Sequence, residues 1–493
     1  MNFELRAEVR AQIFHSLEAY LVFFNLAWKG LIFMAALKLS DIKKGAHIFF
    51  IGIGGISMSG LAQVALRDGY RVSGSDRSDS NIVKKLRDAG AEVFIGHDAE
   101  HVKGADLVVH TAAVHEDNPE MAACTELGIK RVDRAEFLGA IMREYKSSVG
   151  VSGTHGKTTT TGMLAHALIH AGIDPTISIG GELDLIDGNI HCGTGDCFVT
   201  EACEYTNSFL KFFPTIALIT NIEEDHLDFF SGIDEIRESF RTFAYLTKDV
   251  GSVVAMYDDD NVRKALSGCD DLNIISYGMD AARDYHPENL KVNGGFPEFD
   301  VVKRGEVVCY VKLNVPGKHN VLNALAAVAV CELLGIDAQT AADGLGTFKG
   351  THRRFEIKGY LNGALVIDDY AHHPTEIRAT LSAAKEFPHK RIWCVFQSHT
   401  YSRTRTLWKD FVEAFDDADI LVMTHIYPAR EVFDGVTKPE KLTDEIKARG
   451  VNAIYIDDFK DIEYYLRQNV GEGDLVFTMG AGDVTVIGNE LVK

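Results

Sequence analysis

The sequence predicts an α/β fold with parallel sheets, divided into about three domains. Three observations support this fold class. The chain has 493 residues, too many for one hydrophobic core, and domains usually hold ~150 residues. Short apolar runs alternate with helical stretches along most of the chain. Glycine-rich segments follow two of the apolar runs, at residues 52–55 and 153–156, and each precedes a helical stretch.

The first strand, helix and second strand are expected at residues 47–53, 58–67 and 71–75. The glycines between strand and helix are typical of a dinucleotide fingerprint, but Ser57 stands at the third glycine position. This favours a nucleotide or nucleotide-sugar site over an ordinary nicotinamide cofactor, with a mere tight turn as the alternative. Asp76 is placed to bind a sugar hydroxyl, and a strand at 108–114 should face the same crevice. The candidate residues are Gly52, Gly54, Gly55, Ser57, Asp76, His110 and Thr111.

The second glycine-rich loop, SGTHGKT from Ser152 to Thr158, is typical of a triphosphate site. Its backbone N–H groups can turn inward, Lys157 adds a positive charge, and the Thr158 hydroxyl can bind magnesium. The helix that runs to His170 adds its positive dipole end. The first glycine of a standard P-loop would stand at Val151, so an ordinary glycine turn is the alternative reading.

Acidic residues follow two later strands. Residues 198–200 lead to Glu201, and residues 216–220 lead to the segment NIEEDHLD at 221–228. Ligands of open parallel sheets lie beyond the carboxyl ends of the strands, so these acids should converge on the phosphates and could bind magnesium. A solvated acidic loop is the alternative, and His226 taken alone could be structural.

Composition limits the partners. The net charge of −21 argues against binding of nucleic acid, and the eight scattered cysteines are typical of reduced, buried thiols.

We expect residues 1–43 to be an N-terminal extension, disordered or helical. Its apolar part fits neither a membrane span nor a signal peptide. We expect a misassigned start, with translation beginning at Met34, and an amphipathic or membrane-touching helix is the alternative. A membrane partner is therefore not expected unless this extension is real.

Four motifs resemble those of the Mur ligases. They are GTHGKT from Gly153, NIEEDHLD from Asn221, PGKHN from Pro316 and DDYAHHP from Asp368. The resemblance runs from about Ala46 to the C-terminus and is strongest to the branch that adds L-alanine. It implies an N-terminal Rossmann-like domain that binds the UDP-sugar, a central P-loop ATPase-like domain that binds ATP, and a C-terminal Rossmann-like domain that binds the amino acid. We expect these at residues 44–146, 147–348 and 349–493.

The resemblance also implies a cytoplasmic, ATP-dependent ligase of peptidoglycan synthesis, with one or two Mg²⁺ ions. ATP would phosphorylate the lactyl carboxylate of UDP-N-acetylmuramate, and the amine of L-alanine would attack the acyl phosphate. Little covalent work would fall to the protein, so alignment and charge stabilisation should dominate. The alternatives are a muramyl-tripeptide recycling ligase, a ligase for a later residue, a nucleotide-sensing relative without turnover, and a nicotinamide dehydrogenase.

The family's roles carry over to matching positions. Lys157 would bridge the β- and γ-phosphates, Thr158 and Glu201 would bind magnesium, and His226 would contact a second metal. The lysine that carries a carbamate in several relatives is absent from residues 231–246, with Lys248 nearest, so the ligands of that metal stay open. Asn320, with Asn323 one turn on, resembles the adenine reader, or else merely caps its helix. The remaining residues implied for ATP are Gly153, Thr154, His155, Gly156, Thr159, Arg354 and Asp369.

The amino acid site is implied to lie in the last domain, at Tyr370, His372, His399 and Arg403. Arg403 would clamp the carboxylate, with Arg405 as the alternative. His372 could orient or deprotonate the amine, because the nucleophile must be neutral. Arg354 would reach the γ-phosphate, although a surface ion pair is an alternative reading of this residue.

Overall fold

The computed structural model describes residues 37–111 and 113–493. It contains three β-sheets. The described part of the chain divides into two compact units, one formed by residues 37–54 and 65–144 without 112, the other by residues 55–64 and 145–493. The predicted start at Met34 and most of the N-terminal extension lie outside the described residues. Within the described part, Leu39–Asp41 form a short 3₁₀ helix, η1, before the first strand.

The first sheet is parallel throughout, in the order β3-β2-β1-β4-β5. Phe49, Ile51 and Val108 alternate along its strands and pack into a buried cluster with Met121 of α4. The prediction of a Rossmann-like sheet is confirmed. Its elements are β1 (His47–Ile51), α2 (Ile56–Arg67), β2 (Arg71–Asp76), α3 (Asn81–Asp88), β3 (Glu92–Ile95), β4 (Leu107–His110), α4 (Pro119–Leu127), β5 (Arg131–Asp133) and α5 (Arg134–Met142).

Several predicted boundaries in this part were wrong by a few residues. The first strand ends at Ile51 and not at residue 53, because Gly52 has φ +79° and turns the chain. The helix begins at Ile56 and not at residue 58. The strand expected at residues 108–114 is Leu107–His110, so Thr111 lies just beyond its end.

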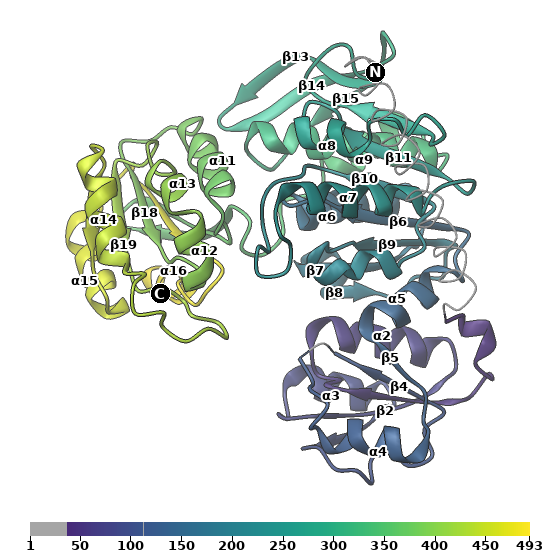
Figure 1. The fold of residues 1–493 in the computed structure, drawn as a ribbon. Coiled ribbons are helices and arrows are strands. Elements are labelled where there is room, and N and C mark those ends of the chain that lie inside the picture. Colours follow the sequence, from purple (N-terminus) through teal and green to yellow (C-terminus); the bar gives the residue numbers. More distant parts are fainter. Residues whose placement is uncertain (1–36, 112) are drawn as a thin grey trace, which may run out of the picture. The chain divides into compact units, whose positions relative to one another are not determined.

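The second sheet has ten strands in the order β15-β14-β13-β12-β11-β10-β6-β9-β7-β8. Its middle, from β12 to β7, is parallel as predicted, while β13, β14 and β15 add an antiparallel extension at one end (Figure 1). The strands are β6 (Ser147–Ser152), β7 (Thr176–Leu183), β8 (Gly188–His191), β9 (Cys197–Glu201), β10 (Ile216–Ile219), β11 (Ser252–Met256), β12 (Ile274–Tyr277), β13 (Tyr285–Asn293), β14 (Phe296–Lys303) and β15 (Glu306–Lys312).

Helices cover both faces of this sheet. Val149 and Val151 of β6 join a large buried cluster with α6, α9 and α10, whereas Gly150 between them points to Phe243 of α7. The helical elements are α6 (Lys157–His170), η2 (Asp184–Ile186), η3 (Tyr205–Lys211), α7 (Ile233–Tyr245), α8 (Asp260–Ala265), α9 (Lys318–Leu333) and α10 (Ala338–Leu345).

The third sheet runs β16-β17-β21-β18-β19-β20, with only β16 antiparallel to its neighbour. Alternate residues of its central strands enter two separate buried clusters, one on each face, as in a doubly wound fold. Its elements are β16 (Glu356–Leu361), β17 (Ala364–Asp369), α11 (Pro374–Lys385), β18 (Ile392–Phe396), α12 (Tyr401–Thr406), α13 (Trp408–Val412), β19 (Ile420–Met423), α14 (Pro439–Ala448), β20 (Asn452–Tyr455), α15 (Phe459–Asn469), β21 (Leu475–Met479) and α16 (Thr485–Leu491).

Two further features bear on the sequence-based expectations. In residues 37–111 and 113–493, every helix is too short or too polar to cross a bilayer. All eight cysteines lie in this described part, and none forms a disulfide.

Candidate active site

The glycine-rich loop connects β6 to α6 at the carboxyl end of the parallel strands. Gly153 has φ +135° and Gly156 has φ +84°, conformations that L side chains rarely adopt. A side chain at Gly153 would also collide with the hydroxyl of Thr220, just after β10. Both glycines are therefore required by the turn, and Val151, where a standard P-loop has its first glycine, is buried within β6.

Asn221 fixes the shape of this loop. Its side-chain oxygen accepts the His155 N–H at 2.8 Å, and its amide donates to the His155 carbonyl at 3.0 Å. The Thr154 N–H bonds to the Asn221 carbonyl at 3.1 Å. Asn221 thus holds the loop by three hydrogen bonds, a role that the sequence analysis did not assign.

Lys157 begins α6 and bends back over the loop. Its ammonium donates to the Thr154 carbonyl at 3.1 Å, contacts the Gly153 carbonyl, and pairs with the buried Glu204 at 3.1 Å. Burial opposes the charge, but Glu204 outweighs it and raises the pKa of Lys157 above its usual value. The loop therefore keeps a fixed positive charge.

Glu201, the last residue of β9, lies where hard oxygen ligands were expected. Its Oε1 accepts the Gly180 N–H at 2.6 Å, and the Thr158 hydroxyl also bonds to its carboxylate. Burial raises the pKa of Glu201, while Lys157 and Arg354 act against this rise. A carboxylate beside a threonine hydroxyl is a donor set that fits Mg²⁺.

His226 lies in the loop after β10, with φ +54°. Its Nε2 is 3.9 Å from Oε1 of Glu204 and 3.8 Å from Oδ2 of Asp225, and its ring packs against Tyr205 with the ring centres 4.5 Å apart. An imidazole nitrogen next to two carboxylates can serve as a metal ligand. Lys248, the nearest lysine considered for a carbamate, forms an ion pair with Asp271.

Asn320 and Asn323 form a buried pair on the first turns of α9. The Asn323 amide donates to Asn320 at 2.9 Å, and the Asn320 amide donates to the Pro316 carbonyl at 2.7 Å. Gly317 holds the N-cap position, so Asn320 is not the cap that the alternative reading required. Both asparagines line an open pocket together with His155, Thr159, Arg354 and Asp369.

Arg354 and Asp369 both line this pocket. The Arg354 guanidinium lies 3.5 Å from Glu376 and 5.2 Å from the centre of the Tyr370 ring. Because only 11% of the Glu376 side chain is exposed, this is not a surface ion pair. Asp369 ends β17 and accepts two backbone N–H groups; burial raises its pKa to about 6, although Arg354 opposes the rise.

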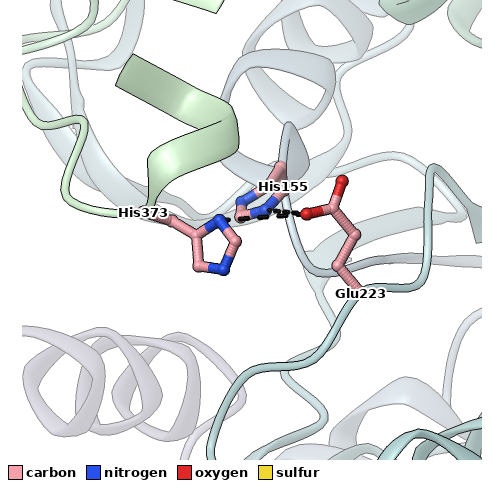
Figure 2. Close-up of side chains that lie close together, drawn as sticks. All are labelled: His155, Glu223 and His373. Atoms are coloured by element: carbon pink, nitrogen blue, oxygen red, sulfur yellow. Dashed lines mark ion pairs between the residues drawn. The ribbon is translucent and has the colours of Figure 1, made fainter. Parts of the chain in front are cut away.

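His155 of the glycine loop, Glu223 and His373 form a cluster drawn from three segments (Figure 2). Oε2 of Glu223 is 3.5 Å from His155 Nε2 and 3.8 Å from His373 Nδ1, and it accepts the Thr375 hydroxyl at 2.7 Å. His155 Nδ1 lies 3.2 Å from Glu376. Burial alone would lower the pKa of His155, but hydrogen bonds to the two glutamates raise it to about 9. The cluster therefore links the glycine-rich loop to the start of α11.

The residues predicted for the amino acid lie together. The His372 and His399 rings are 5.7 Å apart, Tyr370 packs edge-on to His372, and Arg403 bonds to His399 at 3.0 Å. Arg403 also pairs with Asp225 at 2.9 Å, within a pocket beside His226. Arg405 is 58% exposed and pairs with Asp434, so the geometry supports Arg403 as the clamp.

Several of the predicted nucleotide-sugar residues lie near the end of β1. The Gly54 N–H donates to Asp76 Oδ2 at 2.9 Å, and a Cβ at Gly52 would lie 3.1 Å from the Thr111 methyl. Asp76 therefore already orders the glycine turn. His110 ends β4, Gly55 precedes α2, and Ser57 lies in the first turn of that helix.

The sequence analysis missed three buried or half-buried polar residues of the site, which are Glu204, Asn221 and Glu376. Asn221 opens the quoted segment NIEEDHLD and Glu204 follows Glu201 by three residues, so an amide or a carboxylate next to assigned residues was the available signal. Glu376 stands two residues beyond its motif and becomes visible only through its contacts. Asp225 belongs to the acidic segment that was expected near the phosphates, but its pairing with Arg403 was not expected.

Sequence profiles of one protein family match the chain in three consecutive segments. The profiles are described as Mur ligase family, catalytic domain, at residues 47–146; Mur ligase middle domain, at residues 151–331; and Mur ligase, glutamate ligase domain, at residues 353–482. Together these segments span most of the chain.

Curated relatives and solved structures agree with these profiles. The chain is 50% identical to the UDP-N-acetylmuramate–L-alanine ligase of Caldanaerobacter subterraneus subsp. tengcongensis, over 92% of the chain and 98% of the relative. It is 49% identical to the enzyme of that name from Clostridium tetani, over 92% and 99%. The structure of UDP-N-acetylmuramate–alanine ligase from Thermotoga maritima aligns with a TM-score of 0.74 at 32% identity, covering 90% of this chain and 98% of that one. A murein peptide ligase from Psychrobacter arcticus aligns with a TM-score of 0.65 at 26% identity, covering 91% and 98%.

Proposed function

We propose that this chain, which belongs to the Mur ligase family, uses ATP to join L-alanine to the lactyl carboxylate of UDP-N-acetylmuramate in peptidoglycan precursor synthesis. The products are the amide, ADP and phosphate. Curated relatives with nearly the same length carry this activity in their names. The observation that supports it most directly is that Lys157 and Arg354 both lie close enough to Glu201 to lower the pKa of its carboxyl group.

The reaction needs activation because a carboxylate oxygen is a poor leaving group. A carboxylate oxygen attacks the γ-phosphorus of ATP, ADP leaves, and an acyl phosphate forms. The neutral amine then attacks the acyl carbon, a proton leaves the nitrogen, and phosphate departs from the tetrahedral intermediate. Both steps develop negative charge on a departing phosphate group, ADP in the first and inorganic phosphate in the second, so fixed cations are the main requirement.

The residues of this chain fit those requirements. Lys157 and Arg354 would stabilise the transferring phosphoryl group from two sides, and the backbone of residues 153–156 would hold the β-phosphate. Thr158 and Glu201 would hold Mg²⁺, with His226 near a second ion; a bound Mg²⁺ would neutralise phosphate charge. Asn320 and Asn323 would bind adenine, with Asp369 on the ATP side of the pocket. Residues 52–55, Ser57, Asp76, His110 and Thr111 would bind the UDP-sugar.

The amino acid would bind at the pocket next to His399. Arg403 would exchange Asp225 for the substrate carboxylate, since a guanidinium fork binds either group in the same way. His372 would accept a proton from the amine, and Tyr370 would pack beside it. Because all three substrates are small molecules of the cytoplasm, a cytoplasmic location is part of this proposal.

Product formation tests this proposal. Purified protein is incubated with ATP, Mg²⁺ and UDP-N-acetylmuramate, together with either L-alanine or the muramyl tripeptide, and the ligation product is identified by mass spectrometry. We expect ligation of alanine with one phosphate released per product. Ligation of the tripeptide alone would assign the chain to the recycling activity of murein peptide ligases. ATP binding without any ligation product would identify the chain as a nucleotide-sensing relative without turnover.

A further inference from the structure

Glu376 is a buried carboxylate to which the proposed reaction gives no role. It lies in the first turn of α11, and 11% of its side chain is exposed. One carboxylate oxygen, Oε1, faces His155 at 3.2 Å and Arg354 at 3.5 Å. The other, Oε2, faces His372, at 3.1 Å from its backbone N and 3.3 Å from its Nδ1. A single carboxylate thus contacts the phosphate loop, the candidate γ-phosphate arginine and the candidate base.

The surroundings of His372 select one tautomer. Its Nδ1 lies 3.0 Å from the carbonyl oxygen of Tyr370 and 3.3 Å from Oε2 of Glu376. Both neighbours are acceptors, so Nδ1 carries the proton. In the neutral ring, Nε2 then holds the free lone pair. This is the arrangement of a base whose ring is oriented by a third group.

We propose that Glu376 is a positioning residue that acts through His372 in the amine-capture step, an inference that rests on the proposed function. An amino acid arrives as an ammonium ion, which cannot attack an acyl phosphate. His372 Nε2 accepts one ammonium proton, and the freed amine attacks the acyl carbon. Phosphate leaves with the electron pair of the broken carbon–oxygen bond, and the second nitrogen proton passes to the departing phosphate. Glu376 stabilises the imidazolium formed in this step until its proton passes to solvent.

The charge states support this arrangement. Burial lowers the pKa of His372 to about 4 against the influence of Glu376, so the ring is neutral near pH 7 and the lone pair of Nε2 is free. Burial would raise the pKa of Glu376, but His372, His155 and Arg354 together hold it well below its usual value. The carboxylate is therefore ionised when an imidazolium needs a counter-charge.

Glu376 also has a structural role, which the test must separate from this one. With His373 it forms a capping box at the start of α11. Glutamine serves in a capping box as well as glutamate, so Glu376→Gln retains the cap and removes the charge. The matched control is Glu386→Gln, on an exposed residue directly after the same helix.

The experiment compares two nucleophiles on the full-length enzyme. L-Alanine needs a base, whereas hydroxylamine is largely unprotonated near neutral pH and captures acyl phosphates unaided. For Glu376→Gln we expect kcat with alanine to fall at least tenfold, since general bases contribute about 10²–10⁴. The rate of hydroxamate formation with hydroxylamine should fall by less than about threefold, because this nucleophile does not need the base. The alanine defect should shrink as the pH rises and alanine loses its own proton, and Glu386→Gln should match the wild type in both assays.

Three outcomes would overturn the inference. Equal losses with alanine and hydroxylamine would show that Glu376 serves phosphoryl transfer or the fold alone. A further loss when Glu376→Gln is added to His372→Gln would show that it does not act through His372. If the variant fails to fold, the ¹⁵N chemical shifts of His372 in the wild type still test the inference. They report which ring nitrogen carries the proton, and a proton on Nε2 would contradict the assignment of the proton to Nδ1. Failure of the proposed function is a separate result: a wild type that makes no alanine product.

Discussion

At the scale of single residues, the charge on His155 is a direct consequence of its surroundings. Its pKa is raised from 6.5 to about 9, and that of Glu223 is lowered from 4.5 to about 2. The stabilisation from His155 is therefore complete below pH 6.5 and lost as the pH rises through 9. That from Glu223 is present above pH 4.5 and lost as the pH falls through 2. We expect both contributions to be complete together from pH 4.5 to 6.5, and to decline progressively toward pH 9 and toward pH 2.

NMR titration of the histidine rings checks this prediction. In the ligand-free wild type, His155 should stay protonated at pH 7.5 and titrate near pH 9. Glu223→Gln should lower that midpoint by at least one pH unit, about the effect of losing one close opposite charge. A wild-type midpoint near 6.5, or no change in the variant, contradicts the ion-pair assignment.

Arg403 and Arg405 separate two readings of the amino acid site. Arg403→Ala should raise the KM for alanine about 10- to 100-fold, the usual worth of hydrogen bonds to a charged group, and change the KM for ATP little. Arg405→Ala is the matched control and should leave both constants within about twofold, because an exposed ion pair contributes little. Steady-state kinetics in which alanine and ATP are varied in turn measures both constants. A larger rise in the KM for alanine in Arg405→Ala than in Arg403→Ala would assign the carboxylate clamp to Arg405.

At the scale of elements, the strand–loop–helix unit of β6 and α6 depends on backbone geometry. Gly153 and Gly172 both have positive φ, but only Gly153 faces a neighbouring side chain, since the space around Gly172 is open. Gly153→Ala should abolish ATP binding in calorimetry and lower the melting temperature. Gly172→Ala should cost only about 1–2 kcal/mol of stability and bind ATP normally. Similar behaviour of both variants would contradict the close approach to Thr220.

The parallel elements of this fold could be predicted from the sequence, and the antiparallel ones could not. Buried parallel strands such as β6 and β10 are continuous apolar runs followed by glycine or acidic loops, which are strong local signals. The extension β13–β15 has a mixed pattern of exposed and buried residues, and its pairing depends on contacts that no motif marks. Strand ends were also misplaced, because a single positive φ at Gly52 decides where β1 stops.

The candidate site followed the same rule. Lys157 stands in the glycine-rich motif and Glu201 at the end of a predicted strand, and Arg354 matches a position of the family, so their chemistry could be predicted. Asn221 and Glu376 act through contacts with residues far away in the sequence: His155 is 66 residues from Asn221. Residue types and spacing do not specify such contacts, which is why these roles emerged only from the structure.

At the scale of the whole molecule, the predicted substrates are divided among sheets. The residues predicted for ATP phosphates surround the second sheet, and those for the UDP-sugar follow mainly the strands of the first. Lys157→Ala should therefore abolish phosphate release, a loss of at least 100-fold for a charge that stabilises the transferring group. Its dissociation constant for UDP-N-acetylmuramate, measured by calorimetry, should stay within about threefold, because Lys157 belongs to a different sheet from most of the residues predicted for the UDP-sugar and substitutions at independent sites have largely additive effects. Equal loss of both would contradict the division of the sites.

The central claim is that ATP activates the sugar carboxylate as an acyl phosphate before the amine attacks. It is tested most directly with UDP-N-acetylmuramate labelled with ¹⁸O in its lactyl carboxylate. We predict that each molecule of phosphate released during ligation of L-alanine carries one oxygen from that carboxylate, as read by mass spectrometry. Product formation with unlabelled phosphate would contradict the account.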